Sequence, residues 1–222
     1  MSIDDAASRR RVVLTDDEVI ALGARSGKPW PSPIFSVDVT DAFEVRRAVE
    51  RGARSLIARG LLGVSAEDSL EAGISDILRP VLDGNLSLGT YLVDSKLAFA
   101  PTGLATAAYA TNEEPWTSEI IAPNGLHYLL QEGSNKCLES IREFLESCFM
   151  SGIPRLPLAP PETSEPAFVC AMRRSSSDEI RVAAFRRDAA FCQTRPPSES
   201  EQPTDVLRPF ESLESALSYL GL

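Results

Sequence analysis

The clearest pattern in the chain is an apolar stripe that runs through residues 45–57. Its members recur at helical spacing and are Val45, Ala48, Val49, Gly52, Ala53, Leu56 and Ile57. A period of about 3.6 residues predicts an amphipathic helix with one buried face. Asp41 can cap its start, with Glu44 three residues further on, and Gly60 is a suitable glycine for its end. The small residues in the middle of the stripe predict that another element packs closely against it.

Ahead of this helix the pattern predicts a short strand, a short helix and a second strand. Residues 12–14 form an apolar run, and Thr15 and Glu18 have the spacing of a capping box that begins a helix. That helix is expected to end within residues 23–27. After three closely spaced prolines, the apolar residues within 34–39 predict the second strand.

Behind the amphipathic helix a further helix is predicted over residues 65–82, with Pro80 ending its regular part. Short apolar segments separated by turn-forming residues follow, which predicts an antiparallel meander. The segments are LSLGTYLV, KLAFA, LATAAYA, WTSEIIA and LHYLLQE, with Pro101-Thr102-Gly103 among the turns. Residues 135–150 return to helical spacing. A hairpin is then expected within 167–191 and a closing amphipathic helix over 210–220. We therefore expect an α+β fold with a central antiparallel β-sheet flanked by helices.

A chain of 222 residues fits one domain of ordinary size. Hydrophobic residues make up 43% and charged residues 24%, which predicts a folded protein rather than a disordered one. We expect residues 1–11 to be a loose N-terminus and residues 12–152 to form an α+β subdomain. After a proline-rich linker at 153–166, residues 167–222 are expected to complete the same domain with the hairpin and the last helix.

The chain has 22 basic and 32 acidic residues, which gives a formal net charge of −10. An acidic surface repels phosphate backbones and disfavours nucleic acid as a partner. No apolar run approaches the roughly 20 residues that span a bilayer, and the polar N-terminus is unlike a secretory signal. The four cysteines form no Cys-x-x-Cys motif, so we expect reduced thiols. We therefore expect a cytoplasmic location without membrane insertion.

No cluster of residues in the sequence indicates catalysis or metal binding. His127 is the only histidine, and no cysteine or paired acid lies near it in sequence, so we interpret it as structural or surface-exposed. The chain has no GxGxxG, GxxxxGK or HExxH motif. We therefore expect no catalytic residue, no metal and no cofactor, in a protein that is not an enzyme. An enzyme that uses dispersed acids in a pocket stays open as a further possibility.

The polar face of the amphipathic helix carries five arginines, which are Arg46, Arg47, Arg51, Arg54 and Arg59. They are mixed with Glu44 and Glu50, and Glu50 precedes Arg54 by the spacing that favours a helical ion pair. A recognition helix for DNA is more often free of acids and follows another helix. We therefore interpret this face as solvated, with nucleic-acid binding through residues 44–59 as the alternative function.

Aromatic residues near turns are the candidates for partner binding. Trp116 follows a turn at the start of a predicted strand, and tryptophan is frequent at binding hot spots. The alternative is that this tryptophan covers the rim of a core. The candidate partner-binding residues around this turn are Trp116, Tyr109, Glu113 and Glu114.

In this order, the elements resemble the EspG family, the cytoplasmic chaperones of actinobacterial type VII (ESX) secretion systems. The resemblance lies in VVLTDDEVIAL, the proline-rich PSPIFSV, the helix that runs into IARGLL, the helix that ends in ILRPVLDG, and the returning helix LESIREFLESC. It covers residues 11–150 in the order and spacing of elements. After Pro154 the chain departs from the family pattern, because the remaining segment is short.

The resemblance implies a central antiparallel sheet flanked by helices, in two pseudo-symmetric subdomains of which the second is reduced. Members of the family have no catalytic residues. They bind the tip of a PE–PPE heterodimer and keep it soluble until secretion. From the resemblance we therefore expect a non-enzymatic chaperone or adaptor, whose partner is a protein client of a type VII secretion system such as a PE–PPE-like heterodimer.

Overall fold

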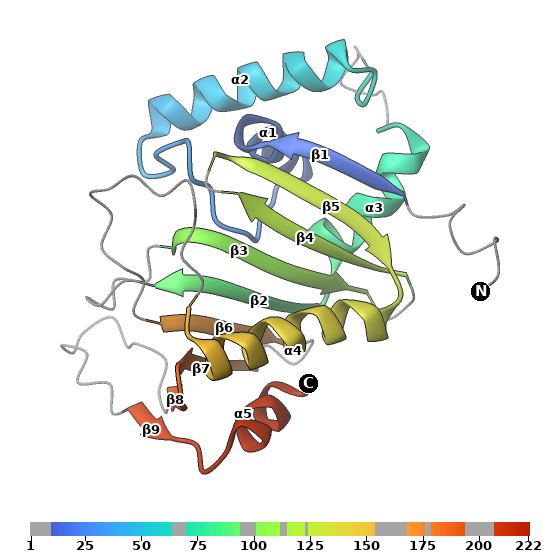
Figure 1. The fold of residues 1–222 in the computed structure, drawn as a ribbon. Coiled ribbons are helices and arrows are strands. Elements are labelled where there is room, and N and C mark those ends of the chain that lie inside the picture. Colours follow the sequence, from blue (N-terminus) through green and yellow to red (C-terminus); the bar gives the residue numbers. More distant parts are fainter. Residues whose placement is uncertain are drawn as a thin grey trace.

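The computed structural model describes residues 10–63, 70–93, 101–111, 115–122, 124–153, 168–175, 179–193 and 207–222. The elements follow one another as β1 (Arg11–Thr15), α1 (Asp16–Ser26), α2 (Ala42–Ala58), α3 (Ala72–Asp83), β2 (Leu86–Val93), β3 (Pro101–Ala110), β4 (Trp116–Ala122), β5 (Leu126–Glu132), α4 (Ser134–Ser151), β6 (Phe168–Arg174), β7 (Ile180–Arg186), β8 (Ala189–Gln193), β9 (Leu207–Pro209) and α5 (Leu213–Leu220). Within these ranges the strands form one antiparallel sheet in the order β1-β5-β4-β3-β2-β6-β7-β8-β9 (Figure 1). The predicted α+β fold with a central antiparallel sheet is confirmed.

The sheet consists of two consecutive meanders that meet in its middle. Strands β2 to β5 extend from the centre to one side and lead into α4, whereas β6 to β9 extend to the other side and lead into α5. β2 and β6 pair antiparallel at the junction, with Thr90 opposite Ala171. The order of elements is therefore pseudo-twofold, and the expected C-terminal hairpin extends the same sheet. Within the described residues, the second meander has no counterpart of α1 to α3 in front of it.

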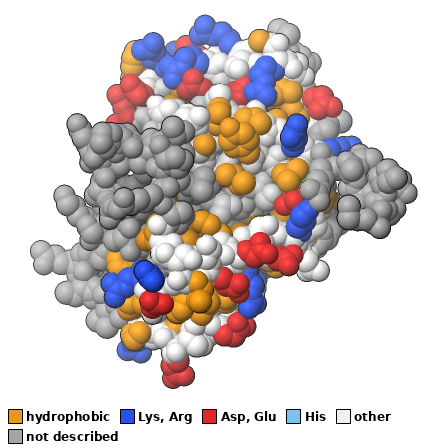
Figure 2. All heavy atoms as spheres, viewed as in Figure 1, with side chains coloured by type: hydrophobic (Ala, Val, Ile, Leu, Met, Phe, Trp, Pro, Cys, Tyr) orange, Lys and Arg blue, Asp and Glu red, His pale blue; other side chains and the backbone are white. Residues whose placement is uncertain are grey.

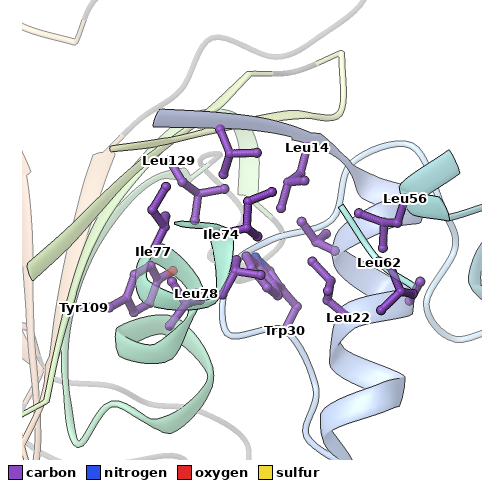
Figure 3. Packing of buried hydrophobic residues seen from close by; sticks show 14 of the residues in the cluster. Leu14, Leu22, Trp30, Leu56, Leu62, Ile74, Ile77, Leu78, Tyr109 and Leu129 are labelled. Atoms are coloured by element: carbon purple, nitrogen blue, oxygen red, sulfur yellow. The ribbon is translucent and has the colours of Figure 1, made fainter. Parts of the chain in front are cut away.

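Helices cover both faces of the sheet. α1 and α3 pack on one face and enclose a first hydrophobic core (Figure 3), whereas α4 and α5 pack on the other face and enclose a second core. Strand β3 contributes to both because successive side chains point to opposite faces. Ala107 and Tyr109 belong to the first core and Ala108 to the second. α2 packs on α1 through buried small residues that include Gly52, as its apolar stripe predicts.

The helix starts follow the predicted capping chemistry. The Thr15 hydroxyl accepts a hydrogen bond from the Glu18 N–H at 3.2 Å, and the Glu18 carboxylate accepts one from the Thr15 N–H at 2.9 Å. Asp41 caps α2 by accepting from two N–H groups of its first turn. Gly60 follows the end of α2 with a φ of +71°, a conformation that glycine adopts without strain. These four residues therefore mark the start of α1 and both ends of α2, as predicted.

The strand predicted within residues 34–39 is wrong, because this segment pairs with no strand. Its backbone donors are used elsewhere: the carboxylate of Asp16 accepts hydrogen bonds from the N–H groups of Phe35, at 3.0 Å, and Ser36, at 2.6 Å. A charged acceptor at the start of α1 forms stronger hydrogen bonds than a neutral carbonyl of a neighbouring strand. The segment is therefore a loop that is attached to α1.

The prediction that Pro80 ends the regular part of this helix is also wrong, because α3 contains Pro80 and continues as α-helix to Asp83. A proline in a helix leaves the carbonyl four residues earlier without its usual donor. Gln131 of β5 partly replaces that donor, with its Nε2 3.5 Å from the carbonyl oxygen of Asp76. The Thr117 hydroxyl donates to the next carbonyl, that of Ile77, at 2.7 Å. Side chains from the sheet thus support the helix around its proline.

The remaining differences concern element limits. The predicted helix over residues 65–82 begins only at Ala72, and residues 64–69 lie outside the described ranges. β3 already begins at Pro101, where a turn was expected, and the expected strand KLAFA lies outside the described residues. β8 was not expected. It follows a two-residue turn in which Asp188 has a φ of +57°, without the glycine that usually indicates such a turn.

Candidate interaction surface

An exposed apolar row crosses the three strands at one end of the sheet. Val13 of β1 lies opposite Tyr128 of β5, and Tyr128 lies opposite Ile120 of β4. Their side chains are 37%, 44% and 50% exposed, respectively. Figure 2 shows hydrophobic side chains gathered between α2 and α4 on the face of the sheet that carries this row. We call these three residues the exposed row.

The exposed row and α4 lie on the same face of the sheet, but α4 does not cover the row. Its buried residues belong to the second core, and it contacts β3, β4 and β7. Ala122, Leu126 and Leu130 flank the row on the same face of the sheet and are half-buried. A contiguous apolar surface of this kind on a folded protein often marks an interaction site. The end of the sheet beyond α4 is therefore the candidate interaction surface.

The open edge of β1 is less suited to binding. Arg59, just after α2, donates from Nη2 to the carbonyl oxygen of Val13 at 2.9 Å. This bond occupies an edge carbonyl that an added strand would need, and charged side chains at sheet edges generally oppose strand addition. A partner is therefore expected to lie on the face of the sheet rather than to extend it.

Directly behind the exposed row, on the face covered by α1 and α3, lies a buried polar cluster. His127 of β5 is fully buried between two carboxylates. Its Nε2 is 2.7 Å from Oδ1 of Asp16, and its Nδ1 is 2.6 Å from Oε1 of Glu119. Asp16 and Glu119 are also buried. Period-two alternation places Glu119 beside Ile120 and His127 beside Tyr128, on opposite faces of the same strands.

The same cluster holds the proline-rich segment between α1 and α2. Trp30 donates from Nε1 to Oε1 of Glu119 at 3.1 Å, and the hydroxyl of Ser32 donates to Oε2. The Tyr109 hydroxyl also donates to Oε2, at 2.7 Å. The ring of Trp30 meets that of His127 edge-on, with 6.2 Å between the ring centroids. Both Trp30 and Tyr109 are visible in the first core (Figure 3). The carboxylate of Glu119 thus joins the segment to the sheet.

Burial and hydrogen bonding act in opposite directions on this cluster. Burial alone would lower the pKa of His127, but the hydrogen bonds that its ring donates to Asp16 and Glu119 outweigh burial and raise the pKa to about 9. Burial would raise the pKa of Asp16, but its bonds with His127 and Ser36 hold that pKa below the ordinary value. Burial, followed by the nearby Glu119, raises the pKa of Tyr109 well above its usual range. At neutral pH the cluster therefore contains a protonated imidazole and a protonated phenol.

The geometry of the cluster does not arrange a nucleophile. The Ser32 hydroxyl contacts Glu119 and Tyr109, while both nitrogens of His127 face carboxylates. A serine nucleophile needs its hydroxyl within hydrogen-bond reach of the imidazole base. Among the residues that the structure describes, no group of three or more histidine, cysteine, aspartate or glutamate side chains is placed to hold a metal ion. What the cluster does in this arrangement is to connect α1, the proline-rich segment, β3, β4 and β5.

Of the four predicted partner-binding residues, the structure describes Tyr109 and Trp116, which it places on opposite faces of the sheet. Tyr109 is only 3% exposed and belongs to the first core. Trp116 is half-buried and packs on the second core, on the opposite face of the sheet. Glu113 and Glu114 lie outside the described residues. The exposed row was missed, although the adjacent Ile120 and Ile121 indicate a strand with apolar residues on both faces.

The arginines of the amphipathic helix have partners nearby. Arg51 forms a bidentate ion pair with Asp17, in which Nε and Nη2 donate to the two carboxylate oxygens at 2.6 and 2.8 Å. Nη1 of Arg59 lies 2.7 Å from the buried carboxylate of Glu18. The remaining contacts are Arg46 and Arg54 with Glu50, both at 3.6 Å, and Arg47 over the ring of Phe43 at 5.7 Å. Two of the five arginines therefore join α2 to α1 and the adjoining strand.

The chain matches no protein-family model, and no curated protein sequence matches it. Within the ranges given above, no helix combines the length and the apolar character needed to cross a membrane. The four cysteines are free thiols in the structure, and burial raises the pKa of both Cys148 and Cys170 to about 11.

Proposed function

We propose that the protein is a non-enzymatic chaperone or adaptor that binds a protein client of a type VII secretion system, a PE–PPE-like heterodimer, in the cytoplasm. The observation that carries the proposal is the exposed row of Val13, Tyr128 and Ile120. An apolar surface on a sheet fits the role of covering an apolar surface of a client.

The shape of the surface favours a helical client. The three side chains of the row lie side by side on adjacent strands, which are about 4.8 Å apart, so the row spans roughly the width of one helix. Strand addition is opposed at the edge of β1 by the bond from Arg59 to Val13. The helical tip of a PE–PPE-like heterodimer is a partner of this shape.

The order of elements also supports the proposal. A pseudo-twofold sheet with a shorter second half is what the EspG resemblance implies. Fold and function are separate matters, so this likeness supports the proposal less directly than the surface does. The buried cluster supports a non-enzymatic role in one respect: both ring nitrogens of His127 contact carboxylates of the protein itself.

The proposal is tested by co-expression with PE–PPE heterodimers, followed by size-exclusion chromatography and titration calorimetry. We expect a stoichiometric complex for the unchanged chain. Ile120→Lys introduces a charge in the centre of the contact and is expected to weaken binding by about 100-fold, or roughly 3 kcal/mol. The matched control is Ile180→Lys in β7, because Ile180 is also exposed, at 55%, but lies in the other half of the sheet.

The possible outcomes distinguish an error in the proposed client from an error in the proposed binding site. If no PE–PPE heterodimer forms a complex with the chain, the proposed client is wrong. If a complex forms and both lysine variants bind equally well, the client is right but the exposed row is not its site. Circular dichroism of both variants shows whether the sheet is retained.

A further inference from the structure

The buried cluster of Asp16, His127 and Glu119 has a property that client binding on the opposite face does not explain. Each ring nitrogen of His127 lies within hydrogen-bond distance of a carboxylate oxygen. An ionised carboxylate only accepts hydrogen bonds, so each contact needs an N–H on the imidazole side. A neutral imidazole has only one N–H. Both contacts are therefore satisfied together when the ring carries both protons and a positive charge.

The two carboxylates are the reason why this charge matters. Asp16 and Glu119 are at most 1% exposed, and in the described part of the chain His127 is the cation that contacts both. Two buried anions without a cation between them repel each other and carry a large desolvation cost. Without the second proton of His127, one carboxylate would face a nitrogen lone pair. Access of water to the carboxylates would then relieve the cost.

The most direct way for water to enter is movement of the proline-rich segment. Trp30 and Ser32 donate to Glu119, and the N–H groups of Phe35 and Ser36 donate to Asp16. These contacts attach the segment to the two carboxylates that His127 neutralises. The elements on the other sides of the cluster are α1 and strands β3, β4 and β5, which belong to the first core.

We propose that His127 acts as a fixed imidazolium that clamps the segment of residues 30–36 to the sheet through Asp16 and Glu119, and that loss of its proton releases this segment. The consequence extends beyond the cluster. The segment forms one wall of an apolar groove of about 630 Å³ between α1 and α2, which Ile20, Trp30, Ile34 and Val49 help to line. The charge state of one buried residue therefore sets the shape of a surface groove.

The other titratable groups that face the cluster come from four elements. Asp16 comes from α1 and Glu119 from β4. From β3, the hydroxyl of Tyr109 donates to Glu119, and burial raises its pKa well above the usual range. From β2, burial raises the pKa of Tyr91 to about 12, with Glu119 as a further cause. A transition near pH 9 therefore belongs to His127 and not to a buried phenol.

Nitrogen-15 NMR of the full chain tests the charge directly, because His127 is the only histidine and its ring signals need no assignment. We expect both ring nitrogens to be protonated at pH 7.5. The titration midpoint is expected near 9, more than two pH units above the ordinary value of about 6.5. A ring with one protonated nitrogen at pH 7.5, or a midpoint at or below the ordinary value, overturns the proposal.

Tryptophan fluorescence tests the release of the segment. The chain has two tryptophans, so Trp116→Phe leaves Trp30 as the reporter. We expect its emission to shift to longer wavelength between pH 7.5 and 10, with the midpoint that NMR gives for His127. His127→Gln is expected to show the shifted emission already at pH 7.5 and no change with pH.

The matched control is Lys28→Gln, which removes an exposed ion pair with Asp83 next to the same segment but leaves the clamp intact. This variant is expected to keep the midpoint. If the emission of Trp30 stays constant while His127 titrates, the clamp does not hold the segment and the proposal fails. Should His127→Gln not fold, coincidence of the two midpoints in the Trp116→Phe chain still decides between these outcomes.

Discussion

Gly52 of α2 packs directly against the carbonyl group of Asp17 in α1. A Cβ atom built on Gly52 would lie 2.0 Å from that carbonyl oxygen, and Ala48 and Leu56 on the same face of α2 are fully buried or nearly so. Backbone cannot give way as the end of a side chain can. The two helices therefore approach as closely as they do because residue 52 has no side chain.

Gly52→Ala is accordingly expected to destabilise the protein. In an exposed helix the same change stabilises by about 1 kcal/mol, but here the added methyl group forces α2 away from α1, at a cost of about 1–3 kcal/mol or more. Urea denaturation measures the difference. Arg54→Ala on the exposed face of α2 is the control, and its effect is expected to stay within about 0.5 kcal/mol. A stabilising effect of Gly52→Ala would contradict the close packing.

The ion pairs of α2 are expected to differ in strength because their burial differs. The carboxylate of Glu18 is fully buried and accepts from Arg59, from Ser55 and from the Thr15 N–H. A double-mutant cycle of Glu18→Gln and Arg59→Met is expected to give a coupling energy of roughly 1.5–3 kcal/mol. Urea denaturation of the four chains gives this value.

The comparison cycle uses the exposed pair of Glu50 and Arg54, in which Nη2 of Arg54 lies 3.6 Å from Oε2 of Glu50. For Glu50→Gln and Arg54→Met we expect about 0.3–0.5 kcal/mol, reduced further by added salt. Equal coupling energies in the two cycles would mean that Arg59 contributes no more than a surface charge.

Stability is expected to fall at alkaline pH because of His127. Its folded-state pKa of about 9 lies above the ordinary unfolded value. The stabilisation is therefore complete below about pH 6.5 and is lost as the pH rises through 9, by about 3 kcal/mol in total. Urea denaturation from pH 6.5 to 9 measures this loss before the buried thiols of Cys148 and Cys170 titrate, since burial raises their pKa to about 11. His127→Gln is expected to flatten this dependence, and an unchanged slope would assign it to other groups.

Neighbouring residues of β4 are expected to respond differently to truncation. Ile121 is fully buried, whereas Ile120 is 50% exposed on the opposite face. Ile121→Ala is expected to cost about 2–5 kcal/mol, and Ile120→Ala to change the free energy of unfolding by less than about 1 kcal/mol. Thermal and urea denaturation compare the two variants. A large loss for Ile120→Ala would show that the exposed row contributes to the fold itself.

Nucleic-acid binding through residues 44–59 predicts a different result from protein binding. Arg51 and Arg59 are used in contacts with α1, and the chain carries a net charge of −10. We expect no retardation of duplex DNA in a gel at low salt. Retardation that weakens steeply with salt and disappears in the Arg46→Glu, Arg47→Glu double variant would support the alternative function instead.

Local signals in the sequence were sufficient for most element starts. The capping box of Thr15 and Glu18 and the cap at Asp41 depend on residues within one helical turn, so their geometry follows from spacing alone. Strand alternation in β4 and β5 likewise predicts which side chains share a face. The antiparallel meander followed from short apolar segments and the turns between them.

The sequence-based predictions were wrong where a side chain distant in sequence forms hydrogen bonds with backbone groups of the segment. Residues 34–39 have the composition of a strand, but the Asp16 carboxylate captures the N–H groups of Phe35 and Ser36. Pro80 is tolerated within α3 because Gln131 and Thr117 reach the carbonyl groups that precede it. No local pattern contains these partners, which lie tens of residues away.

The sequence by itself determined the helices, the meander and the solvent-exposed arginine face of α2, because these depend on periodicity and on neighbours within a few positions. Only the tertiary structure decided the role of His127, which lies 111 residues from Asp16 along the chain. It also decided that the row of Val13, Tyr128 and Ile120 is exposed, since α4 packs on β3, β4 and β7 rather than on β1 and β5. Burial and pairing at long range depend on how whole elements pack, and packing is a property of the complete fold.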